Sequence, residues 1–167
     1  LTEPEAMLHE SMSCTPRLKT AASSFDGHVR LHFHARGAIS NLFLEPEPLL
    51  RPPGNAEVLL HVRAVGLNFR DVLNVLGEYP GDPGPPGGDA AGVVGEMPSS
   101  LHSVFGLGYA PLACAAIATA SFLADKPVTL SFEQASTLPV TWGTTHSAVE
   151  RAGLRAGRVI IVQAAAG

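Results

Sequence analysis

A ten-residue stretch near the middle of the chain restricts the fold more than any other part of the sequence. Residues 79–88 read YPGDPGPPGG, with four prolines and four glycines. Proline fixes φ and lacks a backbone donor, and glycine has no Cβ, so this stretch suits neither the interior of a helix nor that of a strand. The whole chain has 17 glycines and 14 prolines among 167 residues, a larger share than the usual total of about 12%. The sequence therefore predicts short strands joined by turns, with few long helices.

The overall composition is that of a globular domain. Hydrophobic residues make up 46% of the chain and charged residues 16%, which is enough apolar surface to form a core. The net charge is −4 and no run of Lys or Arg occurs, so nucleic-acid binding is not expected. Cys14 and Cys114 have no spacing typical of a disulfide framework or a zinc site. They favour a reducing compartment.

Neither a membrane span nor a signal peptide is expected. The uncharged run 109–124 is shorter than the roughly 20 residues of a membrane-spanning helix and is rich in Ala, Thr and Ser. It predicts buried β structure or a loop followed by a strand. The chain starts with LTEPE, which is acidic and lacks the apolar core of a signal peptide. We therefore expect a cytoplasmic protein without membrane partners.

Three segments have the pattern of β-strands. Residues 28–36 and 57–65 alternate apolar and polar side chains with a period of two, and residues 89–94 form a run of small residues. The connection 46–55 contains Pro-Pro-Gly and predicts a turn-rich loop. Residues 1–24 show no clear period and are expected to be a linker or a peripheral arm.

Two regions have the pattern of helices. From Asn68 to Leu76, apolar residues recur at spacings of three and four. Asn68 can cap the start of this helix and Gly77 can end it. Residues 131–134 read SFEQ, a capping box in front of a second helix. Pro139 is expected to break that helix, and a further helix is expected from about residue 141 to 151.

The end of the sequence predicts the start of a different domain. Residues 159–162 read VIIV, and a strand that is apolar on both faces is typical of a buried parallel sheet. A parallel strand needs a neighbour that is reached through a crossover, and only five residues follow. We therefore expect a βαβ-type domain to begin at about residue 155 and to lack its remainder.

A longer motif around the Pro/Gly stretch resembles a known family. Residues 68–88 read NFRDVLNVLGEYPGDPGPPGG and are followed by DAAGVV at 89–94. This string resembles the enoyl-reductase domains of type I polyketide synthases, in the zinc-free, quinone-reductase-like branch of the medium-chain dehydrogenase/reductase superfamily. The resemblance extends over about residues 28–167 in the family's order. Further matches lie at residues 37–42, 104–107, 135–140 and 164–167.

The resemblance implies a mainly β fold. It implies a GroES-like β barrel that forms the substrate and catalytic domain over residues 28–154. Residues 155–167 would be the first strand of an incomplete, NADPH-binding Rossmann domain, and residues 1–27 would be the linker or peripheral arm. Two departures from the family are visible. The connection 95–103 is shorter than usual, and the sequence ends at Gly167, where the family continues into more glycines and a helix.

The reaction implied by the resemblance is the reduction of a trans-2-enoyl thioester carried on an acyl carrier protein. A hydride from NADPH adds to the β carbon, charge develops on the thioester oxygen, and a proton reaches the α carbon. Tyr79 is our candidate proton donor, because the matching tyrosine of the family lies near the α carbon. The alternative is an aromatic side chain that only packs the loop onto the barrel. A Lys and an Asp in the missing half would then be rival donors.

The resemblance also implies which residues contact the cofactor. Asn68 and Thr144 match positions beside the nicotinamide, although Thr144 has the alternative of helix packing. Ala164, Ala165, Ala166 and Gly167 match the entry to the pyrophosphate turn. Arg70 and Asp71 are neighbours that point in different directions on a helix, and we expect them to be structural residues with separate partners.

No zinc site is expected. Zinc-dependent relatives have a Cys at the position of Asn68 and a His-Glu pair near Asp89, and a zinc ion needs three protein ligands. His28, His32 and His34 share the face of one predicted strand, but Arg30 and Arg36 lie on the same face and oppose a cation.

These observations predict an NADPH-dependent enoyl reductase that works among the other domains of a polyketide megasynthase, with this fragment inactive alone. One alternative is a free-standing quinone or enone oxidoreductase of the same superfamily. The other is a non-catalytic, GroES-like structural fragment.

Overall fold

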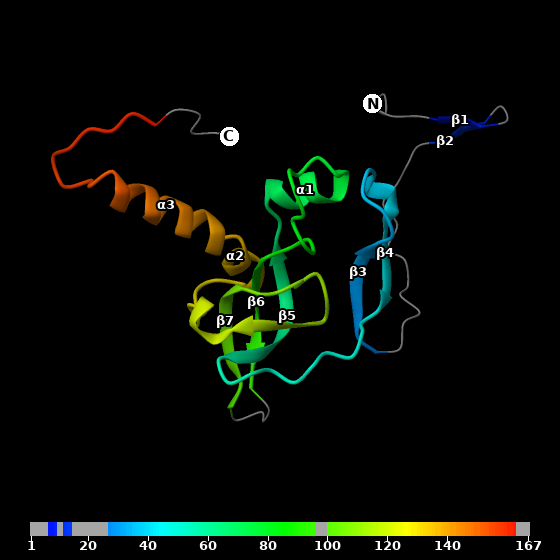
Figure 1. Cartoon of the computed structure of the whole chain (residues 1–167), viewed down its shortest axis with the longest axis horizontal. Helices are drawn as coiled ribbons and strands as arrows, with labels where there is room; N and C mark the ends of the chain where they lie inside the picture. The colour runs from blue at the N-terminus through cyan, green and yellow to red at the C-terminus, as the bar shows by residue number, and fades with distance from the viewer. Residues whose placement is uncertain (1–6, 10–11, 15–26, 96–99, 163–167) are drawn as a thin grey trace.

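The computed structural model describes residues 7–9, 12–14, 27–95 and 100–162, and within these it is mainly β (Figure 1). A five-stranded antiparallel sheet has the order β8-β5-β6-β7-β9, and β3 pairs with β4 in a separate two-stranded sheet. The strands are β1 (Met7–His9), β2 (Met12–Cys14), β3 (Val29–Phe33), β4 (Leu42–Pro46), β5 (Glu57–Gly66), β6 (Asp89–Val94), β7 (His102–Leu107), β8 (Ala115–Thr119) and β9 (Leu123–Asp125). The helices are α1 (Phe69–Leu76), α2 (Phe132–Ser136) and α3 (Pro139–Arg151), with short 3-10 turns at η1 (Ile39–Asn41) and η3 (Ala120–Phe122).

The strands predicted at 28–36, 57–65 and 89–94 are all present as β3, β5 and β6. The run 109–124 is a loop followed by β8, one of the two structures expected for it. Strand β4 was not predicted, because its three apolar residues are consecutive and do not alternate with polar ones. Its backbone becomes a strand through pairing with β3, from Val29 opposite Pro46 to Phe33 opposite Leu42.

The core of the larger sheet is built from small and medium-sized apolar side chains. Its buried cluster contains Leu60, Ala90, Val104 and Ala118, one from each of the four strands β5, β6, β7 and β8. The small residues of β6 allow close approach of its neighbours. A Cβ on Gly92 would lie 2.2 Å from the backbone oxygen of His61, so glycine is required there.

The short connection between β6 and β7 does not disturb their pairing. The two strands are in continuous register from Asp89 opposite Leu107 to Val94 opposite His102. Part of the connection, residues 96–99, lies outside the described residues. The shorter connection at 95–103 therefore leaves the pairing of β6 with β7 intact.

The two sheets are joined through the segment before β8. The N–H of Leu31 donates to the oxygen of Leu112 over 2.7 Å, and the N–H of Cys114 donates to the oxygen of Val29 over 2.9 Å. These bonds attach the β3–β4 pair to the larger sheet. The expected mainly β architecture is confirmed.

The predicted helix signals act at the expected residues. Helix α1 begins after Asn68 and ends at Gly77, which has a φ of 76°, in the left-handed region that glycine adopts without strain. Helix α2 follows the capping box. The hydroxyl of Ser131 accepts from the N–H of Gln134 over 3.1 Å, and the Gln134 side-chain oxygen accepts from the N–H of Ser131 over 3.0 Å.

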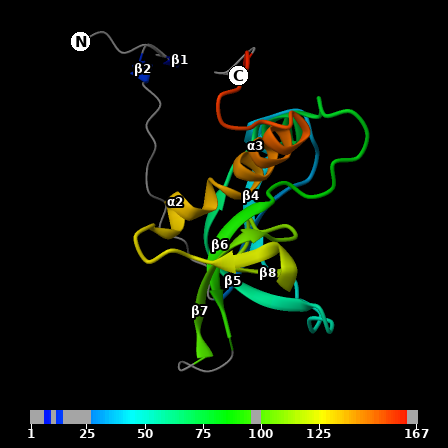
Figure 2. The same ribbon diagram turned by 90° about the vertical axis from the view of Figure 1, so that its left-hand side faces the viewer.

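Proline 139 separates α2 from α3, as predicted, but it also starts the second helix. Helix α3 begins at Pro139 rather than at residue 141. At the first helical position the missing proline N–H has no intrahelical partner to lose, and its fixed φ suits a helix. Figures 1 and 2 show α3 running outward from the end of the sheet where α2 lies, and none of its residues is buried.

The strand predicted at 159–162 is not formed among the described residues. Val159 and Ile161 are 93% and 95% exposed, and this segment pairs with no described strand. A strand gains stability from a hydrogen-bonded neighbour, and none of the described strands is a neighbour of this segment. The assignment of residues 155–167 to a nucleotide-binding domain stays a prediction. So does the boundary of the N-terminal segment at residue 27, although that segment includes the antiparallel pair β1–β2.

The helices of the described part of the chain include none with the length and apolar character needed to cross a bilayer.

The close packing of α2 on the sheet leaves no room for a side chain at position 66, which can be tested. A Cβ at this position would lie 2.1 Å from the backbone oxygen of Ser136, so Gly66→Ala must separate β5 from the end of α2. We expect the free energy of unfolding to fall by about 1–3 kcal/mol, measured by urea denaturation. The control is Gly143→Ala on the exposed helix α3, where an added Cβ meets nothing within 4 Å and should stabilise by up to about 1 kcal/mol. Equal midpoints for Gly66→Ala and the unchanged chain would contradict the close packing.

Candidate active site

Helix α1 is tied at its start to the far end of the Pro/Gly loop, which covers residues 79–88. The N–H of Asn68 donates to one carboxylate oxygen of Asp71 over 2.9 Å. The other oxygen accepts from the N–H of Gly87 over 2.8 Å. Asp71 is buried, so both of its oxygens are used inside the protein. The Asp71 carboxylate thereby accepts from two backbone N–H groups, one at the start of α1 and one in the loop, that have no partner within a helix or a strand.

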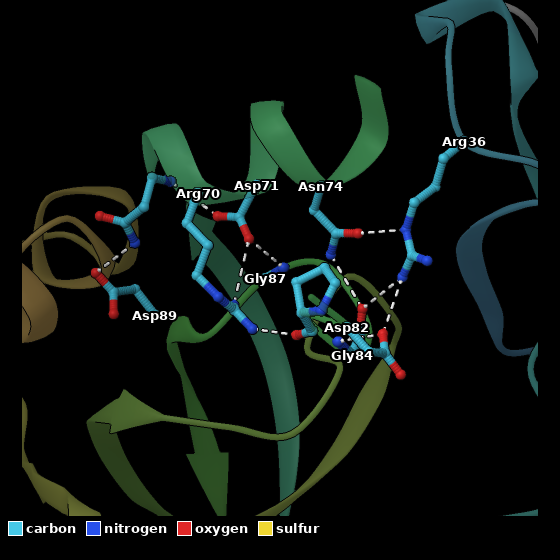
Figure 3. A network of polar contacts seen from close by, with 10 residues as sticks. Arg36, Arg70, Asp71, Asn74, Asp82, Gly84, Gly87 and Asp89 are labelled. Atoms are coloured by element: carbon cyan, nitrogen blue, oxygen red, sulfur yellow. Dashed lines mark hydrogen bonds and ion pairs between the residues drawn. The ribbon is translucent and has the colours of Figure 1, made fainter. Parts of the chain in front are cut away.

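A second contact between α1 and the loop is made by Asn74, which is fully buried. Its amide nitrogen donates to the oxygen of Gly84 over 3.0 Å, and its amide oxygen accepts from Nε of Arg36 over 2.9 Å. Arg36 also lies 3.3 Å from the Asp82 carboxylate. Figure 3 shows these side chains converging on the loop from α1 and from the segment after β3. The middle of the loop is therefore held mainly by side chains, while backbone bonds fix its ends, from Tyr79 N–H to the oxygen of Leu73 and from Gly108 N–H to the oxygen of Gly88.

Tyr79 opens this loop and lies beneath Arg70. The Arg70 guanidinium is 5.7 Å from the centre of the Tyr79 ring, within the range of a cation–π contact. Arg70 also donates to the oxygen of Pro83. Tyr79 is half-buried, and within the described ranges its hydroxyl has no hydrogen-bond partner. The ring is held while the hydroxyl stays available.

Arg70 and Asp71 bind different parts of the loop, Arg70 at Pro83 and Asp71 at Gly87. The two side chains approach each other only to 3.9 Å. This arrangement supports the structural role expected for them.

Asp89, the first residue of β6, connects α1 to α3. One of its carboxylate oxygens accepts from the side-chain amide of Asn68 and from the backbone N–H of Val140, each over 3.2 Å. The other oxygen is buried and has no partner among the described residues. Burial raises the pKa of Asp89, with a smaller contribution from the negative charge of Asp71, while the two hydrogen bonds oppose the shift.

The position of Asn68 and Asp89 bears on metal binding. In this structure they are hydrogen-bonded to each other, where zinc-dependent relatives would have ligands. The described residues contain no group of three or more His, Cys, Asp or Glu side chains placed to hold a metal ion.

Thr144 lies on the exposed surface of α3, one helical turn after Val140. It borders a hollow of about 540 Å³ that is otherwise lined by Gly143, Ser147, Ala148 and Arg151. The structure places Asn68 and Tyr79 at opposite ends of α1 and reaches Thr144 only through Asp89 and α3. It shows no direct contact of Thr144 with either residue. Ala164, Ala165, Ala166 and Gly167 lie outside the described residues.

An apolar cleft of about 490 Å³ lies between β7, β9 and the start of α3. Its lining has no titratable side chain and includes Phe105, Leu123, Leu138 and Trp142. It offers apolar contact but no acid–base chemistry.

Sequence reasoning missed the roles of Asn74 and Arg36, and it considered Asp89 only as a metal ligand. Asn74 follows Asp71 by three residues, which places both on one face of α1. That spacing was a usable signal. Nothing in the sequence indicated that Arg36, 38 residues earlier, would reach Asn74.

Comparisons with known proteins add an independent line of evidence. No protein-family model matches the chain. The spectinabilin polyketide synthase system protein NorB of Streptomyces orinoci is 36% identical over 180 aligned positions, which cover 99% of this chain and 8% of that protein.

Two solved structures have a similar fold. CurK enoyl reductase matches with a TM-score of 0.66 and 29% identity, over 75% of this chain and 43% of that one. A mycobacterial protein complexed with NADPH matches with a TM-score of 0.64 and 25% identity, over 74% of this chain and 40% of that one. The chain thus spans less than half of these solved chains and a small part of the synthase.

The loop contacts predict a measurable cost for removing Asn74. Asn74→Ala removes the acceptor of Arg36 Nε and leaves the oxygen of Gly84 with only the longer, 3.4 Å bond from Arg36, so the free energy of unfolding should fall by about 1–3 kcal/mol. Urea denaturation measures this. The control is Asp82→Ala, whose side chain is 83% exposed although it contacts the same arginine, and which should cost less than about 1 kcal/mol. If the two variants lost equal stability, the buried hydrogen bonds of Asn74 would have no special part in holding the loop.

The raised pKa of Asp89 predicts how stability depends on pH. In the folded state the pKa of this carboxyl lies above its ordinary value of 3.8. The contribution of Asp89 to stability is therefore greatest below that value and decreases as the pH rises through the folded-state pKa. Asp89→Asn cannot ionise, so its free energy of unfolding should increase relative to the unchanged chain between about pH 4 and pH 7. Urea denaturation at both pH values measures the difference. Parallel pH profiles would contradict the raised pKa.

Proposed function

We propose that this chain forms the substrate side of an NADPH-dependent enoyl reductase. The proposal is supported because the chain is a homologue of part of the type I polyketide synthases and shares the fold of an enoyl reductase. The observation that carries the proposal is the corner at α1. There the side-chain amide of Asn68 donates to the buried carboxylate of Asp89, and the Tyr79 ring lies against Arg70 while its hydroxyl has no partner among the described residues.

The polar groups at this corner fit the nicotinamide end of the cofactor. Asn68 supplies a side-chain amide, and Thr144 on α3 supplies a hydroxyl that has no partner in the described part of the chain; a nicotinamide carboxamide offers a matching donor and acceptor. The similarity to a protein complexed with NADPH supports a nicotinamide cofactor. When bound, NADPH supplies the hydride that adds to the β carbon of the substrate. The role of Ala164, Ala165, Ala166 and Gly167 at the pyrophosphate stays a prediction.

Tyr79 would donate the proton that completes the reduction. Its ring is fixed by Arg70 above it and by the loop that it opens. A fixed donor with a free hydroxyl is suited to reach the α carbon of a substrate held at this corner. The Pro/Gly loop, pinned by Asp71 and Asn74, would keep this geometry through turnover.

The substrate proposed is a trans-2-enoyl thioester on an acyl carrier protein, and the other domains of a polyketide megasynthase are the proposed partners. Homology to a synthase over 99% of the chain supports this. It also favours the synthase over the alternative of a free-standing quinone or enone oxidoreductase. The inactivity of this chain alone remains a prediction.

Replacement of Tyr79 tests the proposal in the full-length protein. Tyr79→Phe keeps the ring under Arg70 but removes the hydroxyl, so turnover of an enoyl thioester should slow by about 10²–10⁴-fold, or the configuration at an α-methyl carbon should change. Steady-state kinetics and chiral analysis of the product measure both.

The matched control is the other tyrosine of the chain. Tyr109 is 71% exposed and lies in the loop before β8, so Tyr109→Phe should leave rate and stereochemistry unchanged. If Tyr79→Phe also left both unchanged, Tyr79 would have no part in the reaction.

A further inference from the structure

Asp89 is the first residue of β6, the central strand of the five-stranded sheet, and lies in a crowded position close to the starts of α1 and α3. It is 1% exposed and pairs with Gly66 of β5 on one side and Leu107 of β7 on the other. The lack of a side chain at Gly66 makes room for it, because a Cβ there would lie 3.1 Å from Cβ of Asp89. The surrounding backbone therefore leaves its carboxylate little freedom of position.

This carboxylate supplies a cap that helix α3 does not supply for itself. Leu138, which precedes the helix, makes no side-chain capping bond and has helical dihedral angles. Pro139 has no N–H, so Val140 carries the first free donor of the helix. Asp89 accepts from it over 3.2 Å. A carboxylate at a helix N-terminus is favoured both by this bond and by the helix dipole.

The same oxygen of Asp89 also accepts from the side-chain amide of Asn68. One atom on β6 therefore fixes the start of α3 and the start of α1 together. Thr144 follows Val140 by four residues, one turn and about 6 Å along the helix axis. Asn68 and Thr144 are the two described residues proposed above to contact the nicotinamide.

We propose that Asp89 is a positioning residue, whose single oxygen holds the Asn68 amide and the first turn of α3 in one arrangement and so sets the spacing of the two cofactor contacts. This inference rests on the proposed function. The second oxygen of Asp89 supports it. That oxygen is buried without a partner among the described residues, which costs stability, so a need for stability alone does not explain a carboxylate here.

The test compares Asp89→Ala with Asp89→Asn in the full-length protein. Alanine removes the shared acceptor, whereas asparagine keeps one oxygen that can accept both bonds. We expect the Kd for NADPH, measured by its fluorescence, to rise about 10- to 100-fold in Asp89→Ala and to stay within about threefold in Asp89→Asn. KM for NADPH should rise more than kcat falls. If Asp89→Ala does not fold, Asp89→Ser, whose side chain is too short to reach both donors, takes its place.

A double-mutant cycle with Asn68→Ala shows whether Asp89 acts through Asn68. If it does, adding Asp89→Ala to Asn68→Ala should weaken NADPH binding by less than Asp89→Ala weakens it alone. Fully additive effects would overturn the proposal. An unchanged Kd in Asp89→Ala, or an equal loss in Asp89→Ala and Asp89→Asn, would also overturn it.

A second readout needs no cofactor. In the 167-residue chain, NMR of Asp89→Ala should show loss of exchange protection at the Val140 amide and a shifted Asn68 side-chain amide, and Asp89→Asn should retain the protection. Unchanged protection and shifts in Asp89→Ala would refute the shared anchor. If the unchanged full-length protein bound no NADPH and reduced no enoyl thioester, the proposed function would fail, while the NMR comparison would still decide whether Asp89 joins the two helices.

Discussion

The structure around the candidate site depends on hydrogen bonds that side chains of other segments make to the backbone of the Pro/Gly loop. Four of its ten residues are prolines and have no N–H, and its remaining donors and acceptors are not arranged in any regular element. Asp71 and Asn74 of α1 take up the bonds at Gly87 and Gly84, and Arg36 closes the arrangement from the segment after β3. Asp71 and Asn74 are buried and Arg36 is partly exposed. Together their bonds join the helix to the loop, with Asn68 at the start of the helix and Tyr79 where the loop leaves it.

The sheet beneath this unit is suited to bring it close to α2 and α3. Strand β6 is composed almost entirely of Ala, Gly and Val, so its neighbours approach closely, and Gly66 of β5 touches the end of α2. A carboxylate at the start of this strand then lies within reach of both α1 and α3. Larger side chains in β5 or β6 would increase these separations, and the bonds of Asp89 to Asn68 and Val140 would break. The packing of small residues is thus what makes the polar connection between the helices possible.

Several elements were predictable because their signals are local. The alternation at 57–65 depends only on the period of a strand, and Gly77 ends α1 because of its own backbone freedom. The capping box at Ser131 involves residues three apart. By contrast, β4 is a strand through its pairing with β3. Residues 159–162 have a strand-like sequence but no described neighbour to pair with, and a neighbour is a property of the fold rather than of the segment.

The sequence alone determined the mainly β class, the positions of α1 and its caps, the irregular loop at 79–88, and the resemblance that singled out Asn68, Tyr79 and Thr144. These depend on short-range periodicity and on residues adjacent in the chain. Only the tertiary structure decided that Arg36 meets Asn74 and that Asp89 joins Asn68 to Val140, across separations of 38, 21 and 51 residues. Such contacts follow from strand register and from the packing of helices on the sheet, and neither can be computed from the pattern of any single segment.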